Sequence, residues 1–169
     1  MQLVPLDEPE LLERAAGWIG RPENRRWLDF GGSVRELGPT TLKVMSQRSV
    51  HVLRAFTNGD GDPIGLVALS EVHPEFKTAS PWFVLGEKDH AGKGYTTRAV
   101  ADLLTYGFRD LGLLSVLAWT VETNTPSIRL LERLRFRYLG RRRHCHVIDG
   151  RSLDRLFFDL LAHEHREGV

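Results

Sequence analysis

The chain has 169 residues, of which 41% are hydrophobic and 27% charged, and its formal net charge is +1 at pH 7. These values are typical of one globular domain, so we expect residues 1–169 to fold as a single unit. The small net charge argues against nucleic acid as a partner, and the single cysteine, Cys145, excludes an internal disulfide. No stretch has the length of an apolar membrane span or a signal peptide, so we expect a cytoplasmic monomer or homodimer.

The first third of the chain predicts one strand and two helices, then a strand pair. "QLVPL" alternates as a strand does, and Asp7 is placed to cap a helix with apolar residues at helical spacing up to Ile19. The stretch 21–48 is the hardest to assign, although "PENRRWLDF" indicates a short helix followed by a loop. "HVLRAFT" and "IGLVALSEV" are typical of two strands joined by the turn "NGDGDP".

Strands and helices alternate in the next part of the chain. "SPWFVLGE" and "LLSVLAWTV" are short apolar runs of the kind found in buried strands. Between them, "DHAGKGYTTRAV" (residues 89–100) is a glycine-rich turn that enters an amphipathic helix. "NTPSIRLLERLRF" predicts a second helix with Thr125 as N-cap and Pro126 at the first position.

The last segment predicts an antiparallel pair, "YLGRRRHCHVI" and "SLDRLFFDLLA", which turns at Asp149-Gly150. The periodicity of the second arm also allows a helix. The whole order of elements is that of a mixed α/β protein.

The turn at residues 89–100 has the features of an anion site. Its glycines allow successive N–H groups to converge on an anion, and the helix N-terminus adds positive potential. It is not a nucleotide P-loop, because Gly94 follows Gly92-Lys93 where Ser or Thr is required. It is not a dinucleotide fingerprint either, because Thr97 stands at the third glycine position. A plain helix-starting turn remains the alternative on these residues alone.

A longer stretch, from "WFVLGEKDHAGKGY" to "NTPSIRLLERLRF", resembles the core of the GNAT N-acetyltransferases. It is closest to the branch of the ribosomal-protein N-terminal acetyltransferases and related small-molecule amine acetyltransferases. The family pattern is Gln/Arg-x-x-Gly-x-Gly/Ala at a helix start, then Asn-x-x-Ser before a helix that ends in Gly-Phe. The matching residues, in order, are Gly92, Gly94, Asn124, Ser127 and Phe136.

The resemblance covers about residues 64–162, which would form the acetyl-CoA-binding core and a closing hairpin, while residues 1–63 would form the acceptor side. It implies the GNAT fold: a central mixed, mostly antiparallel sheet of about six or seven strands. This sheet would be splayed between strands 4 and 5 and flanked by helices on both faces.

The resemblance also implies acetyl-CoA as cosubstrate, with no metal, and a primary amine that attacks the thioester directly. Backbone N–H groups before the turn would hold the thioester and pantetheine arm, and those of the turn would hold the pyrophosphate. Asn124 would bind the pantetheine arm or the adjacent backbone, and Ser127 would bind the departing thiolate; both residues also suit a helix start. The remaining implied cofactor-binding residues are Phe83, Val84, Leu85, Gly92, Lys93, Gly94, Tyr95 and Thr96.

Three positions depart from the family pattern. Asp89 stands where Gln or Arg normally supports the pyrophosphate turn, and Arg135 replaces the glycine of Gly-Phe. Leu131 falls where many members have a tyrosine that protonates the leaving thiolate; leucine cannot donate a proton, so the resemblance identifies no general acid.

The attacking ammonium must lose a proton, which calls for a carboxylate or histidine near the acceptor. Glu71 is our first candidate for this base, and His73 and Glu122 are weaker ones, since all three are also typical solvated loop residues. Trp82 and Trp119 are candidates for the acceptor cleft, with core packing as the alternative. His144 and His146 share a strand but lack a second ligand pair, so we expect no metal site.

Three functions remain open. The first is acetylation of a small-molecule amine, and the second is acetylation of a peptide N-terminus. Residues 21–48 should wall the acceptor site, where a closed pocket would favour the first and an extended groove the second. The third is a non-catalytic module that binds acyl-CoA, which Asp89 and Leu131 favour.

Overall fold

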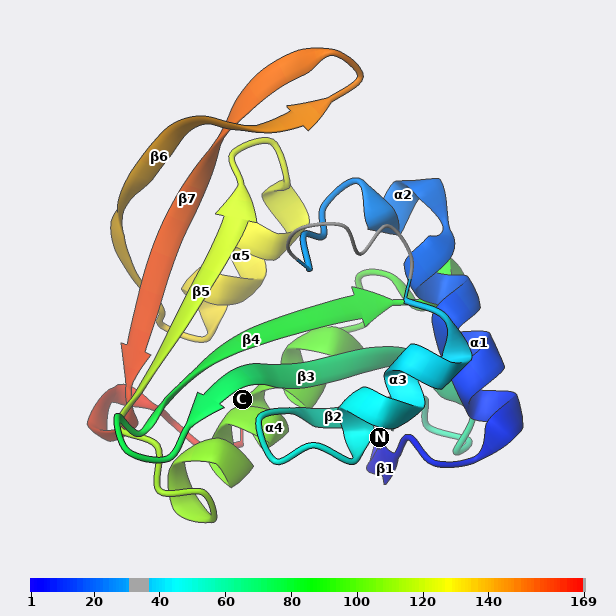
Figure 1. Ribbon diagram of the computed structural model, residues 1–169. Helices are drawn as coiled ribbons and strands as arrows, with labels where there is room; N and C mark the ends of the chain where they lie inside the picture. Colours follow the sequence, from blue (N-terminus) through cyan, green and yellow to red (C-terminus); the bar gives the residue numbers. More distant parts are fainter. Residues whose placement is uncertain (31–36, 169) are drawn as a thin grey trace.

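The computed structural model describes residues 1–30 and 37–168, and a mixed α/β sandwich is seen (Figure 1). The helices are α1 (Pro9–Gly20), α2 (Pro22–Arg25), α3 (Pro39–Ser46), α4 (Tyr95–Arg109) and α5 (Thr125–Arg133). The strands are β1 (Leu3–Pro5), β2 (Val52–Thr57), β3 (Pro63–His73), β4 (Thr78–Leu85), β5 (Ser115–Val121), β6 (Arg137–Ile148) and β7 (Arg151–Leu161). Single turns of 3-10 helix follow β4 and β7, at Lys88–His90 and Ala162–Glu164.

The strands form one seven-stranded sheet in the order β1-β2-β3-β4-β5-β7-β6. All neighbours are antiparallel except β4 and β5, which are parallel and pair only at Thr78 with Ser115 and Ala79 with Val116. Beyond these pairs the two strands diverge, as Figure 1 shows. The predicted splay between strands 4 and 5 is therefore confirmed.

A proline explains where the splay begins. Gly86 N donates to Ile64 O of β3 at 2.8 Å, so the two-residue alternation of an antiparallel pair turns Ala79 and Pro81 toward β5 instead. Ala79 pairs with Val116, but Pro81 has no N–H to continue the ladder. The parallel pairing therefore ends after Ala79 and leaves the rest of β4 with an open edge.

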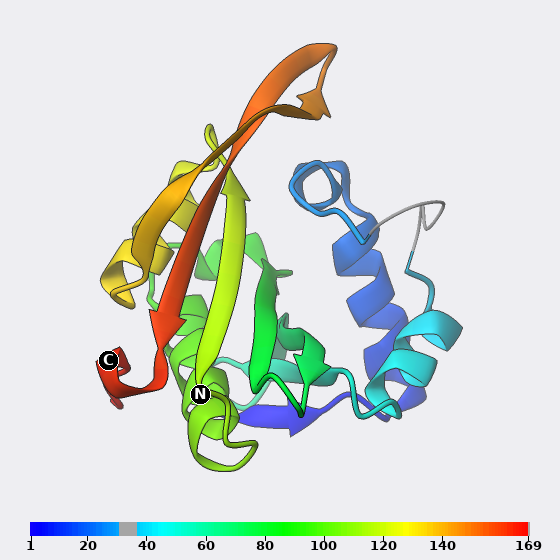
Figure 2. The same ribbon diagram turned by 60° about the vertical axis from the view of Figure 1, so that its left-hand side comes forward.

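Helices cover both faces of the sheet, so that it has two hydrophobic cores (Figure 2). On one face α1 and α3 pack on β2, β3 and β4, with Trp18 and Leu42 almost fully buried. On the other face α4 and α5 pack on the sheet, with Leu103 and Leu131 equally buried. The apolar stripes predicted for the helix after Asp7 and for the helix after the glycine turn are thus the buried faces of α1 and α4.

The structure corrects several details of the sequence reading. The second arm of the closing hairpin is the strand β7, and α3 was not predicted at all. The N-cap of α1 is Glu8 instead of Asp7, without a side-chain bond, because the helix begins one residue later, at Pro9. The N-cap of α5 is Asn124 instead of Thr125, because the Asn124 carboxamide accepts from Ser127 N. Part of the expected acceptor wall, residues 31–36, lies outside the described residues.

Contacts at the end of β4 fix α1 and α2 next to the opening between β4 and β5. A Cβ atom on Gly86 would come within 2.2 Å of the Trp18 ring, so only glycine allows α1 to approach here. Trp18 Nε1 donates to Glu87 Oε1 at 2.8 Å, and this bond is the main reason why the pKa of Glu87 is lowered. Lys88 Nζ joins Asn24 of α2 (2.5 Å) to Leu85 O (2.8 Å).

Candidate functional site

The glycine turn presents free backbone donors at the start of α4. Gly92 and Gly94 have φ values of 76° and 80°, in the left-handed region that favours glycine. The first helical bond runs from Arg98 N to Gly94 O (3.1 Å), so the N–H groups of Tyr95 and Thr96 have no acceptor within the helix. Such groups, together with the helix dipole, suit an anion such as a pyrophosphate.

The side chains around this turn are compatible with an anion but do not all favour one. Lys93 and Arg98 are exposed cations beside the donors, and Arg98 lies over the Tyr95 ring at 5.0 Å. His90 packs edge-on against the same ring (5.7 Å), and its Nδ1 is buried with no hydrogen-bond partner in the described part of the chain. Asp89 is exposed and adds a negative charge, as its sequence position suggested.

The open edge of β4 offers two of the three backbone donors predicted there. The alternation that turns Gly86 N toward β3 also turns Val84 N toward β3, opposite Leu66. Phe83 and Leu85 therefore direct their N–H groups away from β3, into the opening between β4 and β5. These two residues can donate to a ligand in the splay, whereas Val84 contributes its buried side chain.

Asn124 and Ser127 lie together at the other side of the opening, just after β5. Asn124 Oδ1 accepts from Ser127 N at 3.4 Å, so the Asn-x-x-Ser pattern has a capping role in this chain. The Asn124 amide hydrogens and the half-buried Ser127 hydroxyl have no partner among the described residues and can bind a ligand. Leu131 is only 2% exposed within the core, so no proton donor faces the splay from this position.

The two predicted catalytic residues are at opposite ends of β5. Glu71 lies in a bulge at the end of β3, beside the start of β4, with a φ value of 53°. Ser127 follows the end of β5, a strand of seven residues that spans about 20 Å. The fold therefore does not bring them together, and each role has to be tested by itself.

Hydrogen bonds distinguish the candidate bases. Glu71 is exposed and accepts from Ser80 Oγ at 3.2 Å. Glu122 Oε1 accepts from Asp154 N at 2.9 Å, so that carboxylate has a structural role in joining β5 to β7. His73 is exposed beside Phe76, their ring centroids 6.1 Å apart.

A histidine that sequence analysis overlooked lies next to this group. His51 Nδ1 is 3.2 Å from Ser70 Oγ, which also accepts from Trp82 Nε1 at 2.8 Å. Burial lowers the pKa of His51, so its ring favours the neutral form. A lone histidine before a strand gives no signal in the sequence, because the contact with β3 and β4 is made only on folding.

The segment after α2 meets the β6–β7 hairpin through two ion pairs. Arg26 NH2 pairs with Asp149 Oδ2 at 2.6 Å, and Arg155 NH2 pairs with Asp29 Oδ2 at 2.5 Å. Arg155 also lies over the Trp119 ring at 4.0 Å, and Trp82 packs edge-on against Phe30 at 5.2 Å. Both tryptophans are half-buried, and neither lines the cavity described below. We call the segment after α2 (residues 26–30) the arm, and the two ion pairs that join it to the β6–β7 hairpin the arm–hairpin bridge.

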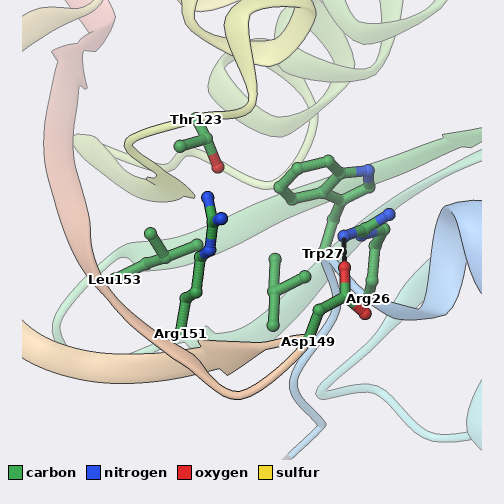
Figure 3. A pocket seen from close by; sticks show the side chains of 7 residues that line it. Arg26, Trp27, Thr123, Asp149, Arg151 and Leu153 are labelled. Atoms are coloured by element: carbon green, nitrogen blue, oxygen red, sulfur yellow. Dashed lines mark hydrogen bonds and ion pairs between the residues drawn. The ribbon is translucent and has the colours of Figure 1, made fainter.

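A cavity of about 370 Å³ lies beneath this bridge. It is bounded by the segment after α2, by the β5–α5 turn and by the hairpin tip (Figure 3). Its lining residues are Arg26, Trp27, Thr123, Ile148, Asp149, Arg151 and Leu153. Since Thr123 immediately precedes Asn124, the cavity adjoins the opening between β4 and β5.

The family follows from a match to a family model, with which the fold and this opening agree. The model of the acetyltransferase (GNAT) domain matches residues 2–137 of the chain. The chain belongs to the GNAT acetyltransferase family. It is accordingly an acetyl-CoA-dependent acetyltransferase, which confirms the family and the class of enzyme expected from the sequence.

Two curated GNAT relatives are similar to the chain. The uncharacterized N-acetyltransferase p20 of Bacillus licheniformis is 36% identical over 102 residues, which are 60% of this chain but only 57% of that protein. The putative ribosomal N-acetyltransferase YdaF of Bacillus subtilis (strain 168) is 27% identical over 168 residues, covering 95% of this chain and 91% of the relative.

Solved structures agree with the fold over nearly the whole chain. A probable acetyltransferase is 26% identical with a TM-score of 0.79, covering 94% of this chain and 92% of its own. Spermidine N-acetyltransferase SpeG from Vibrio cholerae, solved with CoA and spermine, has a TM-score of 0.81 over 96% of both chains. At 19% identity the latter likeness establishes the fold only.

Other motifs of the sequence have structural partners. His146 Nε2 lies 2.8 Å from Arg26 O, and His144 Nδ1 lies 3.2 Å from Ser152 Oγ. Within residues 1–30 and 37–168, no three His, Cys, Asp or Glu side chains are grouped to hold a metal. In the same ranges no helix is long and apolar enough to cross a membrane.

Proposed function

We propose that this GNAT protein transfers the acetyl group of acetyl-CoA to the primary amine of a small molecule, by direct attack in a ternary complex. The observation that carries the proposal is the small, half-open cavity next to Asn124. A volume of about 370 Å³ is in the range of small-molecule sites, and the Arg26–Asp149 ion pair borders it on one side.

In this proposal the donor lies in the splay. The N–H groups of Gly92, Gly94, Tyr95 and Thr96 hold the pyrophosphate, with the Lys93 side chain beside it, since Lys93 N donates to His90 O at 3.5 Å. The N–H groups of Phe83 and Leu85 hold the pantetheine arm and the thioester oxygen. Asn124 donates to the arm from the opposite side. The backbone positions the thioester, so that the chemistry depends mainly on the placement of the amine.

The reaction then needs two proton transfers. The amine nitrogen attacks the carbonyl carbon, a C–N bond forms and the C–S bond breaks. Glu71 accepts the ammonium proton through water, and the CoA thiolate is stabilised by the Ser127 hydroxyl and takes its proton from water. The ammonium proton has to pass along several waters to reach Glu71, because Glu71 lies at the opposite end of β5 from Ser127 and the cavity.

Thiol release from acetyl-CoA by the purified protein, with a panel of small amines, tests this proposal. We expect release with at least one amine and a product with the mass of its acetyl derivative. Glu71→Gln should lower kcat about a hundredfold while KM for acetyl-CoA stays the same. Glu75→Gln is the matched control, an equally exposed carboxylate in the β3–β4 turn.

Acetylation of a peptide N-terminus is the second candidate, favoured by the relative named as a putative ribosomal N-acetyltransferase. Thiol release with peptides but with no small amine would replace our proposal by this one. Binding of acetyl-CoA without thiol release by either class would overturn the proposed function.

A further inference from the structure

The cavity under the arm–hairpin bridge has an unbalanced charge. Its charged lining residues are Arg26, Asp149 and Arg151. Arg26 and Asp149 compensate each other at 2.6 Å, whereas Arg151 has no hydrogen bond or ion pair within the described ranges. The described lining therefore carries one net positive charge, located on the Arg151 guanidinium.

The free guanidinium is directed into the cavity. Figure 3 shows Arg151 extending from the start of β7 toward Thr123, whose hydroxyl faces it across the space. A guanidinium presents N–H donors in a planar fork that fits both oxygens of a carboxylate. Thr123 is placed to add a third donor to the same group.

Apolar surface surrounds this charged point. Leu153, Ile148 and Trp27 line the same cavity, and the Arg26 guanidinium lies 5.3 Å from the centre of the Trp27 ring. An occupant with hydrocarbon next to its anionic group would bury that hydrocarbon here. A dication such as a diamine would instead place a second positive charge beside Arg151.

We infer that the acceptor is an aminocarboxylate: a small molecule with a primary amine at one end, a hydrocarbon segment, and a carboxylate that Arg151 binds in this cavity. The inference rests on the proposed function, because the amine must extend from the cavity past Asn124 into the splay. Arg151 is then a specificity-determining residue that binds the acceptor without contacting the reacting atoms.

Kinetics with three matched series of straight-chain amines test this inference: ω-aminocarboxylates, alkylamines and diamines of increasing length. We expect the lowest KM with an aminocarboxylate, at a chain length set by the distance from Arg151 to the thioester. Arg151→Gln should raise that KM at least about tenfold and leave the alkylamines within about twofold, since one charge-assisted pair is lost. Arg151→Glu should favour the diamines.

Arg143→Gln is the matched control, because Arg143 is an exposed arginine of the same hairpin that does not line the cavity. It should leave all three series unchanged. Equal effects of R143Q and R151Q would indicate a general loss of surface charge and would overturn the inference.

Calorimetric titration of the CoA-bound protein separates recognition from catalysis. We expect the best aminocarboxylate to bind at least about tenfold more tightly than the alkylamine of equal length, and R151Q to abolish this difference. If alkylamines bind and react as well, the inference fails while the proposed function stands. If aminocarboxylates bind in an Arg151-dependent way but no amine releases thiol, the proposed function fails while the recognition site stands.

Discussion

Single residues in this chain decide how the donor and acceptor sides are built. Asn124 caps α5 and keeps its amide hydrogens free, while Pro81 ends the parallel ladder and opens the splay. Asp89 should weaken donor binding, because it places a carboxylate at the turn that should bind a pyrophosphate. Its effect is one of charge and not of backbone shape, so a substitution can measure it.

Asp89→Arg should tighten CoA binding about thirtyfold at low salt. The substitution removes a negative charge and adds a positive one, each worth about 1 kcal/mol against a nearby anion at the surface. Titration of CoA into the protein at low and high salt measures this, and screening should reduce the gain at high salt. Asp110→Arg, the same charge change at the other end of α4, should have no effect.

Asn124→Ala should destabilise the fold by about 1 kcal/mol, because the first turn of α5 loses its side-chain cap. Thr125→Ala should cost less than about 0.5 kcal/mol, because Thr125 is exposed and lies inside the helix. Urea unfolding of both variants measures the two values. A larger cost at Thr125 would contradict the assignment of the cap.

At the scale of elements, short-range contacts lock the ends of helices and strands in place. The 3-10 turn Ala162–Glu164 after β7 is followed by His165, which packs on α4. His165 Nε2 lies 2.8 Å from Thr105 Oγ1, and its ring lies 5.3 Å from that of Phe108. The C-terminal segment is thus attached to the helix that begins at the glycine turn.

This attachment predicts a pH dependence of stability. Burial lowers the pKa of His165 below its ordinary value of about 6.5, so its stabilising contribution is complete above that pH and is lost as the pH falls. His165→Asn should therefore flatten the decrease in unfolding free energy between about pH 7 and pH 5. A remaining slope is expected, because the pKa of His51 is lowered in the same direction.

Urea unfolding at a series of pH values checks this expectation, with His163→Asn as the control at an exposed position two residues away. The slope of the unfolding free energy against pH is the diagnostic quantity, since a lost packing contact alone would lower stability equally at every pH. An unchanged slope in H165N would contradict the assignment to His165.

At the scale of the whole molecule, the arm–hairpin bridge joins residues more than 120 positions apart. In Figure 1 the tip of the β6–β7 hairpin lies near α2, and the Arg26–Asp149 pair that joins the two regions borders the cavity. Arg155 is 14% exposed as a side chain and Asp29 is 42% exposed, so their pair is partly shielded from water. The bridge should therefore contribute both to stability and to acceptor binding.

A double-mutant cycle with Asp29→Asn and Arg155→Met should give a coupling energy of about 0.5–1 kcal/mol. Both variants should raise KM for the acceptor and leave KM for acetyl-CoA unchanged. The pair of Arg109 with Glu167, 3.3 Å apart and well exposed, is the control and should give a coupling near zero. Equal coupling in both pairs would show that the bridge has no special role.

The order of elements could be predicted because it depends on local pattern. The buried strands β4 and β5 are short apolar runs, and α4 follows its glycines with a regular apolar stripe. The helix α3 was missed because eight residues with one fully buried leucine give too weak a period. The second arm of the hairpin was ambiguous because its pairing with β5 and β6, and not its own sequence, makes it a strand.

The sequence by itself determined the family, the glycine turn and the likeness to an acetyl-CoA site, because these depend on residue types at fixed spacing along one segment. Only the tertiary structure decided that the Val84 N–H is directed toward β3, that Glu71 and Ser127 are far apart, and that Arg151 extends into a cavity. These facts depend on register and on contacts between distant segments. A side chain's neighbours across a sheet or under a hairpin are fixed by packing, which no local pattern encodes.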